Sequence, residues 1–406
     1  MNKKIYMVMA AFVLSSLAIR AAKKVTIEIR NNDSQPRSEV VEIDVAGIYQ
    51  KLGVNSSSLV VTDGKGSEMP SQQTHDGKLL VDVTVPAAGV LNLKVVKGTP
   101  RPCGPWVFGK QYPQRLDDFA WENDKCIYRA YGPALQRKGE KAYGYDVWVK
   151  NTAELVLDQR YTAYTEGQEK MRQLRKESGH ETEIKQIDHN INFHIDHGNG
   201  NDPYKVGPTL GCGVPALMDD GQLAFPWAYK DYQILDNGPL RLTVRFDYPQ
   251  RKLAGEQAVT EHRLMSIDKG SRFCRQTVWY DGLTCKHQIA SGVVIHAEDS
   301  TSYQLGKDYV QYADPTDNPK RNKHTKVFVA ALFPYGAVKT MYLPGKAKGG
   351  ATGHVIGVAA DYQGERYTYY FGSAWSGWEI KTQEEWKTCI TETLQRLKTP
   401  LEIRIK

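Results

Sequence analysis

The feature that most restricts the fold of this chain is a succession of short segments in which apolar and polar residues alternate. In residues 240–248, for example, Leu240, Leu242, Val244 and Phe246 occupy every second position. A period of two places apolar side chains on one face of an extended strand. Such segments recur along most of the chain, separated by Gly, Asn and Asp residues that favour turns. The pattern predicts an all-β protein built from antiparallel sheets.

The first 22 residues have the three parts of a secretory signal peptide. Lys3 and Lys4 give a positive start, residues 5–18 are almost wholly apolar and end in Ser16-Leu17-Ala18, and cleavage after Ala21 or Ala22 is the alternative. The apolar run is shorter than the roughly 20 residues that a membrane-spanning helix needs. We therefore expect residues 1–22 to be removed and the mature protein to be periplasmic or extracellular, with no membrane span.

The remaining strand-like segments divide into two predicted domains. Residues 23–99 contain several short alternating runs, which favour a small β-sandwich of the immunoglobulin type. Residues 100–105 are rich in proline and are predicted to be a linker. Residues 106–406 hold many more strands, and a strand-rich domain of ~300 residues exceeds a simple sandwich. We expect a large antiparallel supersandwich with a few helices, one over residues 166–185 and one after a capping box at Thr382.

Charge and motifs narrow the function classes. The net charge of +7 is spread along the chain, and a mildly positive field attracts anionic ligands. For an exported protein, acidic oligo- or polysaccharide is a more natural partner than nucleic acid. The sequence has no G-x-S-x-G, P-loop, Rossmann or H-E-x-x-H motif, so nucleotide chemistry, serine hydrolysis and zincin proteolysis are unsupported. The six cysteines lack C-x-x-C spacing, so we expect no metal framework and no cofactor.

The first segment that could carry chemistry begins at Arg115 and contains four acidic residues around Trp121. A strand period of two places Asp118, Glu122 and Asp124 on one side. Carboxylates beside an aromatic ring suit sugar hydroxyls, and a close pair could act as acid and base in glycoside hydrolysis. We assign Glu122 and Asp124 as candidate catalytic residues. Arg115, Asp118 and Trp121 are candidate binding residues. The alternative interpretation of this segment is a hairpin turn.

A second segment is a glycine-rich loop that follows a predicted strand at residues 191–196. His197 titrates near neutrality, and Tyr204 could exchange a proton if a nearby cation lowered its pKa. Loops on a rigid β scaffold commonly carry function, so both are candidate catalytic residues. The alternatives are an ordinary polar turn or a Ca²⁺ site that uses Asp196, Asp202 and backbone carbonyls.

A third candidate lies in the alternating segment Glu261-His262-Arg263. Glu261 and Arg263 should share one face of the strand and His262 the other. His262 is a candidate base, and Arg263 could bind a uronate carboxylate bidentately on a concave sheet face. The alternative is a salt bridge on a solvated sheet face. His296, which ends an apolar run, is interpreted as a core histidine.

Tryptophans form the fourth candidate group. Trp375 and Trp378 lie in a Gly/Ser loop after a predicted strand, and Trp227 lies in a second aromatic segment. Tryptophan combines a flat apolar face with a polar edge, which suits the apolar faces and hydroxyl rims of sugar rings. We predict that these residues bind substrate, with core covering as the alternative.

Taken together, five segments resemble an uncharacterised family of secreted proteins, a domain of unknown function from bacterial polysaccharide-degradation loci. They are RLDDFAWENDKCIYRAYGPAL, GYDVWVK, HIDHGNGNDPYKVGPTLGCG, EHRLMSIDKGSRF and YYFGSAWSGW. The resemblance spans nearly the whole chain after the signal peptide. It implies a galactose-mutarotase-like supersandwich behind a small β-domain, and a role in glycan breakdown. It supplies no catalytic residues, so each catalytic role is inferred from the residues alone.

The function favoured by the sequence is a polysaccharide lyase or related enzyme that processes uronate-containing glycans. In β-elimination, His197 or His262 would be the base, Tyr204 the acid, and Arg263 or Arg115 the cation that neutralises the uronate. A glycoside hydrolase using the paired carboxylates is the first alternative. A non-catalytic glycan-binding protein, which needs only the tryptophans, is the second, and a mutarotase-type epimerase is the third.

Overall fold

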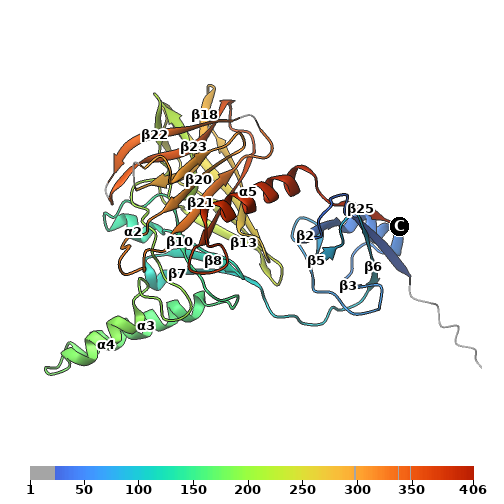
Figure 1. Cartoon of the computed structure of the whole chain (residues 1–406), viewed down its shortest axis with the longest axis horizontal. Helices are drawn as coiled ribbons and strands as arrows, with labels where there is room; N and C mark the ends of the chain where they lie inside the picture. Colours follow the sequence, from blue (N-terminus) through green and yellow to red (C-terminus); the bar gives the residue numbers. More distant parts are fainter. Residues whose placement is uncertain (1–22, 297–298, 337, 348) are drawn as a thin grey trace, which may run out of the picture.

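The computed structural model describes residues 23–296, 299–336, 338–347 and 349–406, so the predicted signal peptide lies outside the described residues. The described chain consists mainly of antiparallel strands arranged in a small and a large domain (Figure 1). The prediction of an all-β protein with a small sandwich followed by a large one is confirmed. No helix of the described residues is long and apolar enough to cross a membrane.

The small domain packs two antiparallel sheets around an apolar core. Its buried side chains include Ile27, Val81 and Leu93, contributed by three strands. A short helix that the sequence did not predict begins after Asp44, whose side chain accepts from the Ala46 N–H. The two sheets have the orders β25-β1-β6-β3 and β2-β5-β4. The elements are β1 (Lys24–Arg30), β2 (Arg37–Asp44), α1 (Val45–Leu52), β3 (Leu59–Thr62), β4 (Ser71–Gln73), β5 (Lys78–Val85), β6 (Val90–Lys97) and β25 (Glu402–Ile405).

The last strand belongs to this small domain rather than to the large one. β25 pairs antiparallel with β1, with Ile27 opposite Ile405. Ile403 and Ile405 pack against the small core, while Glu402 and Arg404, which alternate with them, are exposed. The expectation that residues 106–406 form one domain is therefore wrong at its C-terminal end. The alternation of the last strand is the same as in the first domain, because it completes that domain's sheet.

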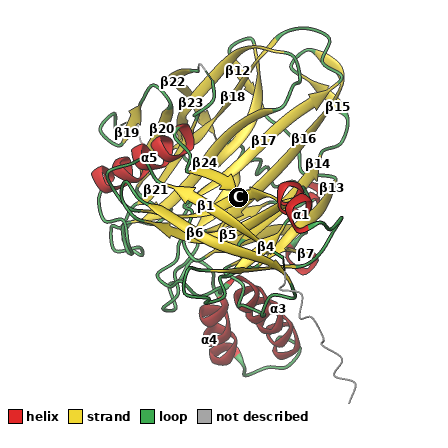
Figure 2. Cartoon of the chain, turned by 90° about the vertical axis from the view of Figure 1, so that its right-hand side faces the viewer, coloured by secondary structure: helices red, strands yellow, loops and turns green. Residues whose placement is uncertain are grey.

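The large domain is a two-sheet sandwich. One sheet has five strands: β12 (Gln222–Ala224), β11 (Cys212–Asp219), β18 (His287–Ile295), β23 (Ala351–Tyr362) and β22 (Lys339–Ala347). The other has nine: β13 (Asp231–Gly238), β14 (Arg241–Asp247), β16 (Glu256–Asp268), β17 (Phe273–Asp281), β24 (Tyr367–Trp375), β21 (Val327–Leu332), β20 (Tyr309–Asp314), β19 (Tyr303–Leu305) and β15 (Arg251–Leu253), which pairs with β16. Neighbouring strands of the second sheet run side by side in Figure 2.

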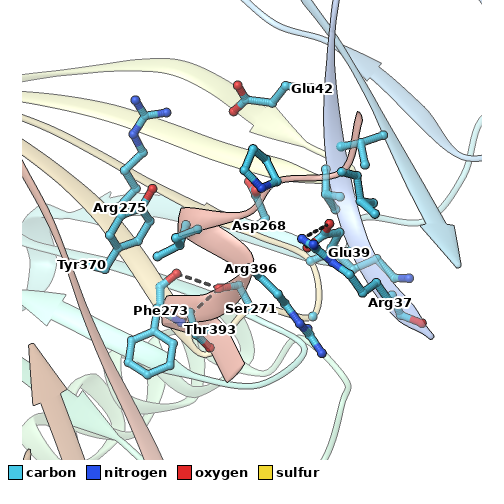
Figure 3. A pocket seen from close by; sticks show the side chains of 18 of the residues that line it. Arg37, Glu39, Glu42, Asp268, Ser271, Phe273, Arg275, Tyr370, Thr393 and Arg396 are labelled. Atoms are coloured by element: carbon cyan, nitrogen blue, oxygen red, sulfur yellow. Dashed lines mark hydrogen bonds and ion pairs between the residues drawn. The ribbon is translucent and has the colours of Figure 1, made fainter. Parts of the chain in front are cut away.

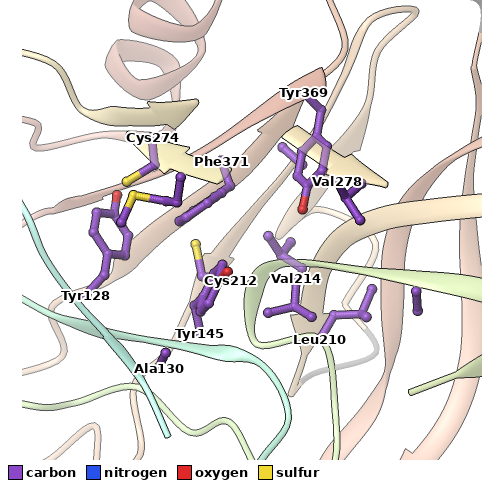
Figure 4. Close-up of a cluster of buried hydrophobic side chains, with 14 of the residues drawn as sticks. Tyr128, Ala130, Tyr145, Leu210, Cys212, Val214, Cys274, Val278, Tyr369 and Phe371 are labelled. Atoms are coloured by element: carbon purple, nitrogen blue, oxygen red, sulfur yellow. The ribbon is translucent and has the colours of Figure 1, made fainter. Parts of the chain in front are cut away.

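The core of the sandwich is aromatic and closely packed. Side chains from both sheets, such as Val214, Val278 and Phe371, meet in its centre (Figure 4). Gly213 on β11 has a φ of +89°, and a Cβ atom there would lie 2.1 Å from the Cβ of Phe371. The two sheets therefore approach at a point where only glycine fits. Leu242, in the segment that most clearly alternates, is completely buried in this core.

A third, four-stranded sheet lies beside the sandwich and has two different faces. It consists of β10 (Tyr145–Trp148), β9 (Ile127–Ala130), β8 (Asp118–Asn123) and β7 (Val107–Tyr112). On one face Trp121 and Tyr128 join the main core. On the other face Asp118 and Glu122, which the sequence placed on one side, lie with Arg129 beneath a helix. This second face buries charged groups beside a small apolar cluster that includes Trp148 and Tyr161.

The helices differ in part from expectation. The single helix predicted over residues 166–185 is two helices, α3 (Leu157–Leu174) and α4 (Glu181–Ile191), which project together from the sheets (Figures 1 and 2). The strand expected at residues 191–196 is absent, because α4 runs to Ile191 and turns follow. α5 (Gln383–Lys398) has the predicted Thr382–Glu385 capping box. The remaining short helices are η1 (Pro113–Arg115) and α2 (Pro133–Arg137).

We predict that the last strand stabilises the small domain through its inward side chains. Ile403→Ser should lower the free energy of unfolding by about 1–3 kcal/mol, because it removes a partly buried apolar group from the core. Arg404→Ser, on the exposed side of the same strand, is the matched control and should change stability little. Equal unfolding curves for the two variants in urea would show that β25 does not contribute to this core.

Candidate functional site

The charged face of the four-stranded sheet is organised around Arg129. Its guanidinium nitrogens lie 2.5 Å from Asp146 Oδ2, 3.3 Å from Asp202 Oδ2 and 3.4 Å from Asp118 Oδ2. Asp146 lies opposite Arg129 on the neighbouring strand, whereas Asp202 comes from the loop after α4. All four side chains are at most 6% exposed. Arg129 thus ties a long loop to the sheet.

Burial shifts the protonation of this cluster. Desolvation and the nearby charge of Asp146 raise the pKa of Asp202 well above its ordinary value. Burial also raises the pKa of Asp118, although Arg129 opposes the shift. Three carboxylates around one guanidinium cannot all ionise cheaply in a low dielectric. Burial therefore favours the protonated forms of Asp202 and Asp118, and the cluster is a positioning element with little net charge.

Arg129 and Asp202 place the loop of residues 199–211. Asn201 donates to the Asn322 side chain, and the carbonyl of Pro203 accepts from Asp317 N at 2.7 Å. Tyr204 is buried and its hydroxyl donates to the Gly211 carbonyl at 3.2 Å. Burial raises the pKa of Tyr204 well above its ordinary value. This is the opposite of the lowering that the acid role predicted for Tyr204 requires.

A histidine–aspartate pair lies on one side of this loop. His296 follows β18, and its Nδ1 lies 2.6 Å from Asp314 Oδ2 at the end of β20. The His296 ring also meets the ring of Tyr204 edge-on, at 6.1 Å between centroids. Asp314 is 1% exposed and accepts from Thr316 N as well. A carboxylate at Nδ1 fixes the hydrogen there, so Nε2 is the basic nitrogen of His296.

A second histidine lies nearby on the neighbouring strand. His354 of β23 stands opposite Val294 of β18, two residues before His296. Its Nε2 accepts from Leu210 N at 3.2 Å, which leaves the hydrogen on Nδ1. Burial, and secondarily the charge of His296, lowers the pKa of His354 to about 4. The site therefore combines an imidazole held by a carboxylate with one that is neutral at ordinary pH.

An aromatic row leads away from His354. The rings of Phe225 and His354 are 5.9 Å apart, and Tyr143 stacks on Phe225 at 5.6 Å. Trp227 follows at 6.3 Å from Tyr143 and is 38% exposed. These three aromatic residues, Tyr143, Phe225 and Trp227, form a partly exposed surface next to the two histidines. Trp227 is the predicted sugar-binding tryptophan that lies at this surface.

A basic loop borders the same region. Residues 318–326 follow directly after Asp314 and Asp317, both of which contact the site. This loop carries the exposed side chains of Lys320, Arg321, Lys323 and Lys326. Arg321 pairs with Asp317 at 2.5 Å. The concentration of positive charge favours an anionic ligand at this place.

The structure brings together part of the first two predicted segments. Arg115 contributes positive charge at Asp118 and Asp202, and its guanidinium lies 5.6 Å from the ring of Tyr164. His197, in contrast, lines a separate hollow of about 160 Å³ beside α3 and meets the ring of His189. Arg115, Asp118 and the Asp202 loop thus share a site that does not include His197.

The predicted carboxylate pair is not formed. Glu122 is completely buried, where it accepts from Lys150 Nζ at 2.8 Å and from Leu157 N at 2.6 Å. Asp124 lies in the turn between β8 and β9, as in the alternative interpretation of this segment, and accepts from Gly270 N. Trp121 is fully buried, and its indole N–H points to the sulfur of Cys274 at 3.4 Å. These side chains hold the structure and do not face a ligand.

The third segment is also placed differently from expectation. Glu261 and Arg263 share a face, but this face is the main core, where Arg263 Nε lies 2.5 Å from Glu261 and the guanidinium stacks on Tyr248 at 4.4 Å. His262 lies on the other face, between two aspartates and against the ring of Trp279. Arg263 is fully buried, so it offers no surface for a uronate.

The two paired tryptophans lie at different places relative to this site. Trp378 stands beside Lys125 and Arg272, at the turn that joins β8 to β9. Asp118 and Arg129 lie near the opposite, open end of the same hairpin. Trp375 pairs with Val327 at the start of β21, which pairs in turn with Asp314, so this partly buried residue lies two strands from Asp314. His197 and Trp378 therefore do not join the single groove predicted from the two loops and the tryptophan pair.

Sequence reasoning misses the two histidines that form the observed site. His296 ends the apolar run VVI, which favours a core residue, and no sequence motif singles out His354. A polar, titratable residue at the end of a buried strand is the signal that could have found His296. The partners of the two rings, Asp314 and Leu210, are distant in sequence, so only the fold reveals the pairs.

A cavity of about 910 Å³ lies between the two domains (Figure 3). Its lining is charged, but Arg37 pairs with Glu39, and Arg241 bridges Glu42 and Asp268. His75 and Asp236 join the same interface at 2.7 Å. Most of its charges thus neutralise one another, and we regard this cleft as a domain interface.

Comparison with known proteins gives a family and distant structural likenesses. A family described as "Domain of unknown function (DUF4861)" matches residues 29–403. "Uncharacterized protein P7" of Formosa agariphila is 23% identical over 99% of this chain and 98% of its own length. An alpha-mannosidase from Enterococcus faecalis has a TM-score of 0.45 at 9% identity, over 95% of this chain and 46% of its own. A Glycosyl Hydrolase Family 38 protein from Enterococcus faecalis has a TM-score of 0.48 at 8% identity, over 95% and 47%. The chain spans about half the length of these solved structures.

The raised pKa of Asp202 predicts a pH-dependent destabilisation. The unfolded chain ionises this carboxyl near pH 4, while the folded protein keeps it protonated to a higher pH, so folding stability falls over that interval. Asp202→Asn removes this pH-dependent loss of stability, because an amide does not titrate. The free energy of unfolding of the variant, relative to the native protein, should therefore rise as the pH increases from about 4 to 7.

The matched control is Asp188→Asn, on the exposed side of α4. Chemical unfolding at several pH values gives the free energy of unfolding of the native protein, of Asp202→Asn and of Asp188→Asn. Parallel stability curves for the native protein and Asp202→Asn would contradict the proposed protonation of the cluster.

Proposed function

The chain belongs to the DUF4861 family, and we propose that it is an exported carbohydrate-active enzyme that cleaves acidic glycans by β-elimination. The observation that carries the proposal is the pairing of His296, oriented by Asp314, with the neutral His354 beside an aromatic row and a basic loop. The proposal keeps the reaction class favoured by the sequence but assigns it to different residues.

In this reaction His296 transfers the proton. Its Nε2 takes the hydrogen from the carbon next to the uronate carboxylate, and the bond to the leaving glycosidic oxygen breaks. The same nitrogen then returns the proton to that oxygen, so one imidazole serves as base and acid. Asp314 stabilises the imidazolium between the two steps, since its carboxylate lies 2.6 Å from Nδ1.

His354 has a different role because it is neutral. With Nε2 occupied by the Leu210 N–H, Nδ1–H is the hydrogen-bond donor that His354 would offer to a ligand. A neutral imidazole can polarise a carboxylate as negative charge develops in the transition state. The depressed pKa, about 4, keeps His354 in this state at neutral pH.

Two surfaces support an acidic sugar polymer as the substrate. The partly exposed rings of Tyr143, Phe225 and Trp227 suit the apolar faces of successive sugar rings. Lys320 and Lys323 of the basic loop could balance uronate charge. Hydrolysis is less well supported, because Glu122 is bound to Lys150 inside the protein and Asp124 stands apart from it.

The test is incubation of the purified protein with a panel of uronate-containing polysaccharides, followed by mass spectrometry. Elimination gives products one water lighter than those of hydrolysis, and a binding protein gives no products. For the substrate that is cleaved, we predict that His296→Asn lowers kcat by about 10²–10⁴-fold, because it removes the proton-transferring group. Asp314→Asn should lower kcat by a smaller factor.

His180→Asn, on the surface between α3 and α4, is the matched control and should leave kcat unchanged. Products that contain an added water molecule would show that the reaction is hydrolysis and would contradict β-elimination. Activity that survives in His296→Asn but is lost in His262→Asn would show that His262, the candidate base favoured by the sequence, transfers the proton instead.

A further inference from the structure

A second constellation of chemically active side chains lies at the far end of β18 from His296. Glu256 begins β16, Cys285 belongs to the segment that connects β17 with β18, and His287 begins β18. β18 has nine residues and spans roughly 30 Å, so this group is remote from the proposed catalytic histidines. It plays no part in the proposed function.

The three side chains converge on one point. His287 Nε2 lies 2.9 Å from Glu256 Oε1 and 3.4 Å from Cys285 Sγ, and Cys285 Sγ lies 3.3 Å from the same carboxylate oxygen. Zinc–sulfur bonds of about 2.3 Å and zinc–nitrogen or zinc–oxygen bonds of about 2.0–2.2 Å give tetrahedral edges of about 3.3–3.6 Å. The observed triangle is only slightly smaller than one face of that tetrahedron.

The arrangement does not fit a thiol nucleophile activated by histidine. In such a relay the thiol and the carboxylate engage opposite nitrogens of the imidazole. In this cluster Glu256 and Cys285 both approach Nε2 of His287. A shared point of approach is the geometry of three ligands around a single cation.

The site is also built into the fold. The Glu256 carboxylate accepts from Thr284 N at 2.9 Å, from Thr284 Oγ1 at 2.7 Å and from Cys285 N at 3.2 Å. The Glu256 and His287 side chains are only 6% and 8% exposed, whereas Cys285 is exposed. The side chains of Glu256 and His287 are therefore held in the protein interior, and Cys285 would complete the site at the surface.

We propose that Glu256, Cys285 and His287 bind a Zn²⁺ ion that clamps the 282–287 segment to the hairpin formed by β15 and β16. Thiolate, imidazole and carboxylate are a ligand set that Zn²⁺ accepts, and a water molecule would complete four-coordination. Binding displaces the thiol proton to solvent, so affinity rises with pH. Because the segment joins the two sheets of the sandwich, the ion would stabilise their connection.

The experiment titrates the metal-free protein with Co²⁺, which replaces Zn²⁺ and reports its ligands by absorption. We expect one Co²⁺ per chain, a near-ultraviolet band from thiolate-to-cobalt charge transfer, and displacement by Zn²⁺. Cys285→Ser should abolish that band, and His287→Gln should weaken binding by at least about tenfold. Cys103→Ser, which changes another cysteine that is not fully buried, is the matched control and should retain the band.

A measurement on the unchanged protein gives an independent answer if a variant fails to fold. Zn²⁺ should slow the alkylation of Cys285 by iodoacetamide, as located by peptide mass spectrometry, and should leave the alkylation of Cys103 unaffected. The absence of a charge-transfer band in the native protein, or its persistence in Cys285→Ser, would overturn the proposal. So would equal alkylation of Cys285 with and without Zn²⁺.

Discussion

The interaction on which the site depends is the binding of three carboxylates by the buried guanidinium of Arg129. Asp118 and Asp146 belong to the four-stranded sheet. Asp202 belongs to the loop after α4, and its contact with Arg129 attaches this loop to the sheet. Breaking one partner of such a buried ionic group is strongly destabilising, by about 3–5 kcal/mol. The cluster therefore fixes the loop of residues 199–211 on the sheet.

Once that loop is fixed, it gives the two histidines their different states. Leu210 N occupies Nε2 of His354, and the buried Tyr204 lies against the ring of His296. Burial of His354 is the main cause of its low pKa. A single ionic cluster is thus linked, through one loop, to the two histidines of the proposed proton transfer.

Much of the fold follows from local patterns in the sequence. The alternation in residues 240–248 predicts β14, whose Leu242, Val244 and Phe246 are completely buried, and the Thr382–Glu385 capping box predicts the start of α5. Local patterns fail where a segment has a distant partner. β25 alternates like any strand, but only its pairing with β1 assigns it to the small domain.

The site is harder to predict than the fold because charge burial is not a local property. Asp118 and Arg115 do lie near the Asp202 loop. Glu122, however, is bound by Lys150, a partner that the sequence does not identify, and Arg263 pairs with Glu261 inside the protein. The apolar run before His296 favours the core, and its partner Asp314 lies 18 residues away. Alternation states that Glu261 and Arg263 share a face, but not that this face is the main core.

The most direct test of the account is an NMR titration of the imidazole nitrogens of His296 and His354, with and without an acidic oligosaccharide. The account predicts that His354 remains neutral, with its hydrogen on Nδ1, until the pH falls to about 4, and that the oligosaccharide shifts the signals of both rings. A His354 that becomes charged near the ordinary histidine pKa of 6.5, or two rings that respond to no uronate, would contradict it.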